Sequence, residues 1–324
     1  MNTGTEPLQP ADDATLWQRL APRIGAVHLR QRLGIEGEHE HHVFGGPGRT
    51  FFHPENWYSL HGMMRLALRA TLLYRLGQRN ALKIRVRHHT LALPELPAAL
   101  DGMTLLQISD PHLDMHPELP AALATAVASL DYDLCVLTGD YRYRTFGPLD
   151  GVLSGMQTLR VALKGRVYGI LGNHDSIRIV PACEDMGIQM LLNEHTAIEH
   201  RGATLHLAGI DDPHYFRTDN LQRSHHDLAP DQVSILLAHS PEIYRQAAHS
   251  GFSAMLCGHT HGGQICLPGG YGLYYNARCP RRLCHGPWQH QQMIGYTSSG
   301  AGSSIIDVRF NCPPEVVLHR LSRS

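Results

Sequence analysis

From about residue 103 onward, short apolar segments alternate with segments of helical periodicity, and each apolar segment ends in polar residues. The apolar segments predict strands within 103–110, 132–140, 166–175, 203–212, 233–241 and 252–261, and the tail at 305–321 predicts two more. Helical patterns occupy 118–130, 149–163 and the region near 242–250. This alternation predicts α/β layering, with central sheets and outer helices.

The polar residues at the strand ends predict a shared functional site. They are Asp110, Asp140, Asn173, His174, Asp175, Asp211, Asp212, His239 and His259. Functional groups gather at the carboxyl ends of strands in open α/β sheets because the loops converge there. A single Asp after a strand is usually a turn or a helix cap. Six polar strand ends, nearly all of metal-ligand type, make a common site the better explanation.

Several residues at or beside these strand ends are candidate metal ligands: Asp110, His112, Asp140, Asn173, His239, His259 and His261. Carboxylate and amide oxygens together with imidazoles suit Mn, Fe or Zn rather than Ca or a thiolate-bound cluster. The set exceeds what one four-coordinate ion needs, so it predicts two ions. A carboxylate can bridge two ions, and the central Asp140 is the expected bridge. Glycines beside the ligands let the backbone approach the ions closely.

The order D-x-H, GD, GNH[DE], H and GHTHGGQ resembles the signature of the calcineurin-like metallophosphoesterases. The resemblance covers roughly residues 100–320. The stretch LCGHTHGGQICLPGG is most similar to a bacterial subgroup of YkuE-type phosphoesterases and LpxG-type UDP-2,3-diacylglucosamine pyrophosphatases. The resemblance implies an α/β (α+β) fold, a four-layer β-sandwich flanked by helices.

The resemblance also implies a role for each residue. One ion takes Asp110, His112, Asp140 and His261, and the other takes Asp140, Asn173, His239 and His259. His174 lies beside the phosphate, where it donates a proton to the leaving oxygen or a hydrogen bond to developing charge. Asp175 orients its neighbours. The implied reaction is hydrolysis of a phosphate ester or anhydride by a hydroxide that bridges two divalent ions. A metal-stabilised interaction scaffold without turnover is the alternative of another class.

Residues 1–99 differ in character from residues 100–324, so we predict an N-terminal extension and a catalytic domain. Much of the extension is expected to be irregular, with its His/Glu cluster at 36–44 forming a solvated loop. Residues 58–79 or so predict a basic amphipathic helix, since 56–94 contains seven Arg or Lys and no Asp or Glu. Such a helix can lie on an anionic membrane or pack on the catalytic domain with its arginines in solvent. Both interpretations stay open.

The formal net charge of -1 argues against a protein that wraps a polyanion. We therefore expect no nucleic-acid partner, and a nucleic-acid or cyclic-nucleotide phosphodiesterase is the alternative enzyme. The expected substrate is a phosphorylated small molecule or a lipid-linked one such as UDP-2,3-diacylglucosamine, with no obligate protein partner. Arg278, Arg281 and Arg282 follow the histidine pair and could contact substrate phosphate, although a surface loop explains them equally well.

Seven cysteines without a CxxC pair fit a reducing cytoplasm better than a disulfide framework. The first residues lack the apolar core of a secretory signal, and no run of 18 apolar residues occurs. The expected location is the cytoplasm, with peripheral attachment to the inner face of the membrane as a further possibility.

Overall fold

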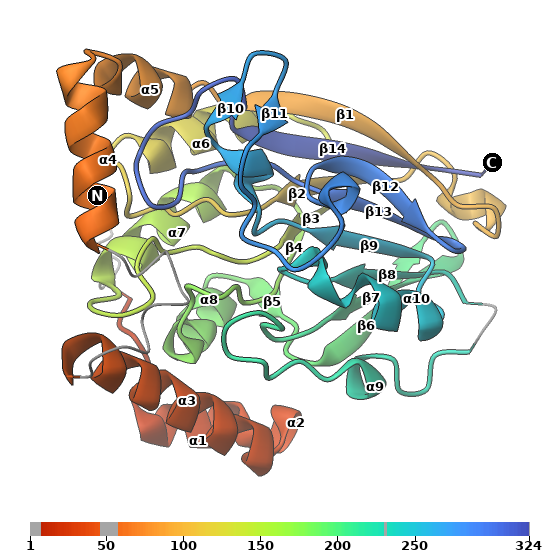
Figure 1. Ribbon diagram of the computed structural model, residues 1–324. Coiled ribbons are helices and arrows are strands. Elements are labelled where there is room, and N and C mark those ends of the chain that lie inside the picture. The colour runs from red at the N-terminus through yellow and green to blue at the C-terminus, as the bar shows by residue number, and fades with distance from the viewer. Residues whose placement is uncertain (1–7, 46–57, 230–231, 324) are drawn as a thin grey trace, which may run out of the picture.

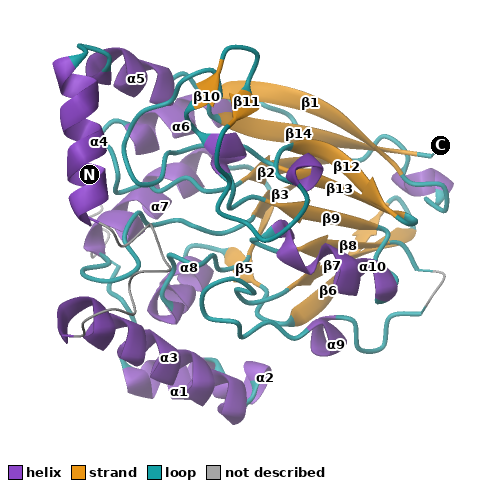
Figure 2. Cartoon of the chain, in the orientation of Figure 1, coloured by secondary structure: helices purple, strands orange, loops and turns teal. Residues whose placement is uncertain are grey.

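The computed structural model describes residues 8–45, 58–229 and 232–323. Two six-stranded mixed sheets pack face to face, and helices cover their outer faces (Figures 1 and 2). The first sheet has the order β1-β14-β2-β3-β4-β5, and the second has the order β12-β13-β9-β8-β7-β6. The predicted α/β sandwich of four layers is therefore confirmed.

The strands of the first sheet are β1 (Arg85–Ala92), β2 (Thr104–Ile108), β3 (Leu134–Leu137), β4 (Arg166–Gly169), β5 (Ile188–Met190) and β14 (Glu315–Ser322). Those of the second are β6 (Glu194–His200), β7 (Ala203–Gly209), β8 (Ser234–Leu237), β9 (Ala254–Cys257), β12 (Gly286–His290) and β13 (Met293–Thr297). A small hairpin pairs β10 (Cys266–Leu267) with β11 (Tyr271–Gly272).

The helices are α1 (Asp13–Arg19), α2 (Ala21–Ile24), α3 (Ala26–Gly45), α4 (Tyr58–Ala70), α5 (Tyr74–Ala81), α6 (Leu119–Ala128), α7 (Asp150–Ala162), α8 (Val180–Asp185), α9 (Leu221–Ser224) and α10 (Tyr244–His249). Short 3-10 turns lie at Ala98–Leu100, Ile177–Ile179, Pro241–Ile243, His261–Gly263 and Arg281–Leu283.

Alternating side chains of the central strands serve two separate cores. On β2, Leu105 points between the two sheets, whereas Leu106 packs in the core that includes α6 and α7. On β3, Val136 lies in the core between the two sheets and Cys135 lies in the core that includes α6 and α7. Strands β2 to β5 run parallel, as do β7, β8 and β9. The loops after these strands therefore meet at one edge of the sandwich.

The expectation that much of the N-terminal extension is irregular is wrong for the described residues 8–45 and 58–99, which are mostly helices and one strand. Helices α1 to α3 lie against the body of the molecule (Figure 1), and Leu16, Leu20, Ile24 and Leu29 are fully buried in the core beside α7 and α8. They come from three successive helices, with Leu16 in α1, Leu20 at its end, Ile24 in α2 and Leu29 in α3.

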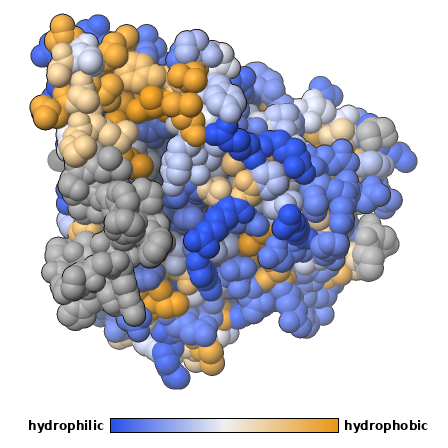
Figure 3. Space-filling model, in the orientation of Figure 1, coloured by the Kyte–Doolittle hydropathy of each residue, from blue (hydrophilic) through white to orange (hydrophobic). Residues whose placement is uncertain are grey.

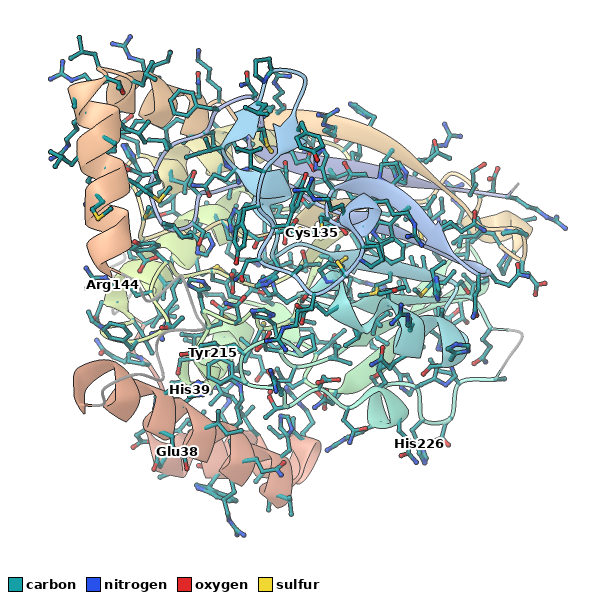
Figure 4. The ribbon with its side chains drawn as sticks, in the orientation of Figure 1. Glu38, His39, Cys135, Arg144, Tyr215 and His226 are labelled. Atoms are coloured by element: carbon teal, nitrogen blue, oxygen red, sulfur yellow. The ribbon has the colours of Figure 1, made fainter. Side chains whose placement is uncertain are left out.

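The His/Glu cluster at 36–44 is helical and not the expected solvated loop, because α3 continues through it. The His39 ring lies 4.3 Å from the Tyr215 ring and 5.7 Å from the Phe216 ring, measured between centroids. Figure 4 shows His39 and Tyr215 together at the contact between α3 and the loop after β7. This end of α3 is therefore packed against the catalytic body.

Other details of the sequence prediction also change. The basic helix expected over about 58–79 is divided into α4 and α5, with Leu72 at φ 61° between them. Strand β1 pairs in parallel with β14, so the first sheet begins before residue 100. The tail forms one strand, β14, rather than two. Among the described residues, no helix has both the length and the apolar character needed to cross a bilayer.

Candidate metal centre

The loops after β2, β3, β4, β8 and β9 bring the predicted metal ligands together. Three sets of side chains have ligand atoms within 4.8 Å of one another: Asp110, His112 and His261; His112, Asp140 and His174; and Asp140, His239 and His259. Asn173 joins them, since its Oδ1 lies 2.9 Å from His239 Nε2 and 2.7 Å from His259 Nδ1. All of these side chains are buried.

Backbone carbonyls fix the orientation of three of the imidazoles. The Nδ1–H of His112 donates to the carbonyl of Arg142 at 2.7 Å, and that of His239 donates to the carbonyl of Thr138 at 2.8 Å. His174 Nδ1 lies 2.5 Å from the carbonyl oxygen of Tyr143. Because a carbonyl only accepts, each ring carries a proton on Nδ1 and turns Nε2 toward the cluster.

The atoms at the centre of the cluster fit divalent cations. His112 Nε2 and His261 Nε2 lie 3.1 Å apart, and His239 Nε2 lies 3.2 Å from Asp140 Oδ2. Lone pairs on the Nε2 atoms of His112 and His261 would repel at this distance unless a positive charge lay between them, and a proton or a cation must also lie between His239 and the Asp140 carboxylate. Burial lowers the pKa of His239, but Asp140 and Asp110 outweigh this effect and raise it to about 10. The carboxylates thus favour positive charge here, which bound cations would supply.

Five of the seven predicted ligands adopt a left-handed backbone conformation. The φ angles are 49° at Asp110, 40° at His112, 58° at Asp140, 70° at His259 and 50° at His261. This region is uncommon for residues other than glycine, and such residues cluster at functional sites. The residue types alone do not signal these conformations.

Two glycines are required by the close approach of the loops. A Cβ at Gly172 would lie 2.2 Å from Asp140 Oδ1, and a Cβ at Gly258 would lie 2.1 Å from Asp110 Oδ2 and 1.9 Å from Ser109 Oγ. No side chain fits at either position without displacing a carboxylate. Steric exclusion of any larger side chain therefore explains why glycine occupies these two positions beside the predicted ligands.

Asp175 lies behind the cluster and holds two of its loops. Its fully buried carboxylate accepts backbone hydrogen bonds from Asp140 at 2.7 Å, from Tyr141 at 2.8 Å and from Gly172 at 2.8 Å. These bonds join the loop after β3 to the loop after β4. This geometry makes Asp175 a positioning residue.

Two buried arginines that the sequence analysis did not select support the same loops. Arg309 donates to the carbonyl of His261 at 2.9 Å and to that of Ser299 at 2.7 Å. Arg32 of α3 donates to the carbonyl of Asp175 at 2.8 Å. Both side chains are fully buried. Arginine is mostly exposed in proteins, and these two are far from the motifs in sequence, so no local pattern identified them.

A cavity of about 250 Å³ opens onto the cluster. Asp140, Asn173, His174, His259 and His261 form its polar side. Its lining also contains apolar residues from three separate segments: Met64, Ile265, Leu273, Ile305 and Ile306. A ligand in this cavity would therefore contact both metal-binding residues and hydrocarbon.

The three arginines predicted to contact phosphate are absent from the described residues that line this cavity. Arg281 instead donates to the carbonyls of Gly272 at 3.1 Å and Leu273 at 2.7 Å, which holds the segment after β11. The backbone N–H of Arg278 donates to Glu242 at 2.6 Å. Arg282 is exposed. Contact of these arginines with a substrate stays a prediction.

Comparison with known proteins agrees with this geometry. Residues 103–263 match the family model of the calcineurin-like phosphoesterases. The metallophosphoesterase YkoQ of Bacillus subtilis is 29% identical over 255 residues, which cover 76% of this chain and 93% of YkoQ. YkuE of the same organism is 28% identical, covering 74% of this chain and 85% of YkuE. The phosphodiesterase YaeI of Escherichia coli is 29% identical, covering 58% of this chain and 70% of YaeI. Together with the clustered ligands, these matches identify the chain as a metal-dependent phosphoester hydrolase whose residues 103–263 are similar to the calcineurin-like phosphoesterases.

Proposed function

We propose that the cluster holds two divalent cations, from among Mn, Fe and Zn, with Asp140 between them. The proposed ligand sets are Asp110, His112, Asp140 and His261 for one ion, and Asp140, Asn173, His239 and His259 for the other. The convergence of imidazole Nε2 atoms and carboxylate oxygens supports this assignment. Two divalent ions with two carboxylates leave the site with a net positive charge, which favours a bound phosphate.

When bound, the two ions supply a nucleophilic water and stabilise charge on the phosphoryl oxygens. The residues of the chain hold and orient the reactants. His174 is fixed through Nδ1 by the carbonyl of Tyr143, so its Nε2 faces the site. In its imidazolium form the ring would donate the Nε2 proton to the leaving oxygen and return to the neutral tautomer with its proton on Nδ1. Asp175 keeps Asp140 in place through the backbone. Burial of the whole cluster strengthens each of these interactions.

We further propose that the substrate is a phosphodiester or pyrophosphate that carries an apolar group. The observation that carries this proposal is the apolar wall of Met64, Ile265, Leu273 and Ile306 in the cavity that the metal-binding residues also line. A phosphomonoester of a small polar molecule would leave that wall in contact with water. The name of the relative YaeI, a phosphodiesterase, supports a diester or anhydride. UDP-2,3-diacylglucosamine has both a pyrophosphate and acyl chains.

A matched pair of substrates tests the proposal. UDP-2,3-diacylglucosamine and UDP-N-acetylglucosamine share the pyrophosphate and differ in their acyl groups. With metal-replete enzyme, kcat/KM is expected to be at least tenfold higher for the diacyl substrate. Leu273→Asp is expected to remove that preference by lowering turnover of the diacyl substrate, with turnover of UDP-N-acetylglucosamine retained. Equal rates for the two UDP sugars would exclude an apolar specificity. Absence of any turnover, in protein that binds two ions, would favour a scaffold.

A further inference from the structure

Exposed apolar side chains are concentrated around the mouth of the cavity. Among the described residues, eleven large hydrophobic side chains are exposed, and nine of them lie within 63–76 or 267–274. The nine are Met63, Leu66, Leu72, Leu73, Leu76, Leu267, Tyr271, Leu273 and Tyr274. Only Val27 and Val161 lie elsewhere. Contiguous apolar surface of this kind on a folded protein marks an interaction site.

The helical part of this surface is fixed to the catalytic body. A Cβ at Gly77 of α5 would lie 2.6 Å from Val308 Cβ, so this turn packs directly on the 307–310 segment. Tyr74 Oη and Gln78 Nε2 both donate to the carboxylate of Asp307 at 2.5 Å. The apolar side chains of α4 and of the turn before α5 therefore stay exposed while the other face of α5 is buried.

The same segment is strongly basic. Residues 56–94 contain seven Arg or Lys and no Asp or Glu. Arg69, Arg75, Arg79 and Lys83 are exposed. In Figure 3 the apolar patch covers α4 and α5 at the upper left. Apolar side chains with flanking arginines match the interface of an anionic bilayer, where hydrocarbon enters the acyl region and guanidinium groups reach the headgroups.

The cavity lies between the two halves of the surface, since Met64 of α4 and Leu273 and Tyr274 after β11 line it. Its volume of about 250 Å³ is too small for a lipid with two long acyl chains. Only the phosphate end and a short length of chain fit, so the remainder of such a substrate must stay in its membrane.

We propose that α4, α5 and the β10–β11 hairpin form a docking surface for an anionic lipid bilayer, which presents the cavity to substrates in that bilayer. The docking surface itself does not depend on the proposed function, and only the statement that the substrate is a lipid rests on it. A second copy of the chain fits the surface less well. A two-fold dimer places the same patch against itself, and the exposed Arg69, Arg75 and Arg79 of the two copies would then face each other.

Vesicle sedimentation tests the docking surface independently of catalysis. The wild-type chain is expected to bind vesicles of phosphatidylcholine in which about a third of the lipid is anionic phosphatidylglycerol. Binding should weaken on pure phosphatidylcholine and in high salt. Leu66→Glu/Leu72→Glu replaces side chains that are 69% and 86% exposed, and Val27→Glu/Val161→Glu replaces matched controls that are 68% and 89% exposed.

The first pair is expected to lower binding more than tenfold and the control pair to leave it unchanged. Arg69→Gln/Arg75→Gln should remove most of the salt dependence. Turnover of bis-p-nitrophenyl phosphate in solution should be the same in all variants. Lack of wild-type binding, or equal binding of both glutamate pairs, overturns the docking surface. A wild-type dimer that becomes monomeric only in Leu66→Glu/Leu72→Glu, without vesicle binding, overturns it in favour of self-association. Vesicle binding without turnover of any phosphate ester contradicts the proposed function alone.

Discussion

Arg32 joins the N-terminal helices to the loop that follows the metal-binding residues, and its replacement by methionine is the most informative test of that link. The guanidinium is fully buried and lies 3.3 Å from Asp211 Oδ2 and 2.7 Å from Glu36 Oε1. It also donates to the carbonyl of Asp175 and lies 3.3 Å from the ring centroid of Phe216. Arg32→Met keeps most of the volume and removes all of the polar contacts.

Arg32→Met is expected to lower the free energy of unfolding because it leaves the buried carboxylate of Asp211 without its guanidinium partner. Removing one partner of a buried ion pair typically costs about 3–5 kcal/mol because the other charge stays buried without compensation. Asp211 keeps His28 at 3.1 Å and Thr218 at 2.9 Å. These contacts place the expected loss of unfolding free energy near the lower end, at about 3 kcal/mol.

Urea denaturation of the metal-free protein, followed by fluorescence, measures this loss. Arg32→Met/Asp211→Asn is the control, since it removes the uncompensated carboxylate and should recover part of the stability. Arg32→Lys should fall between the wild type and Arg32→Met, because a single ammonium cannot reach all of the partners that the guanidinium contacts. A loss below about 1 kcal/mol for Arg32→Met, or a double variant less stable than the single one, would refute the reasoning.

Four further outcomes are expected. Asp140→Asn should weaken both ions together, and metal analysis that finds only one ion lost would contradict the bridge. His174→Ala should keep its metal content, while its kcat should fall by a factor of about 10²–10⁴. Loss of metal from this variant would instead make His174 a ligand. Gly258→Ala should lower the unfolding free energy by about 1–3 kcal/mol and weaken metal binding, because the new Cβ collides with Asp110 and Ser109. Burial raises the pKa of Asp211, but Arg32 and His28 outweigh this effect and lower it to about 2, below its unfolded value. Its stabilisation is thus present above about pH 4 and is lost as the pH falls toward 2, and urea denaturation should show the wild type losing about 2 kcal/mol more than Asp211→Asn over that range.

The catalytic sheets were predictable because their signals are local. A buried strand such as β3 reads as a continuous apolar run, and its next polar residue, Asp140, necessarily lies near the ends of its parallel neighbours. The sequence order of the polar strand ends therefore carried spatial information. Strands β6, β12 and β13 lack this combination, and the sequence analysis did not select them.

The buried arginines that hold the site loops were not predictable, because their contacts are to residues distant in the sequence. Arg32 and Arg309 are separated from the loops they hold by many residues of chain, and a long charged side chain normally indicates solvent. Likewise, Asp110 and His261 adopt left-handed conformations that neither residue type favours strongly. Tertiary contacts impose both features, so they become visible only when the loops are placed side by side.

The N-terminal region is part of the catalytic structure in three separate ways. Leu16, Leu20 and Ile24 belong to the same core as α7 and α8, and β1 extends the first sheet beside β14. Arg32 fixes Asp175, and through it the backbone of Asp140. Met64 of α4 lines the cavity that opens onto the metal-binding residues. The change in composition near residue 100 therefore does not separate two cores. Residues before this point support and border the site, whereas the predicted metal ligands all come after it.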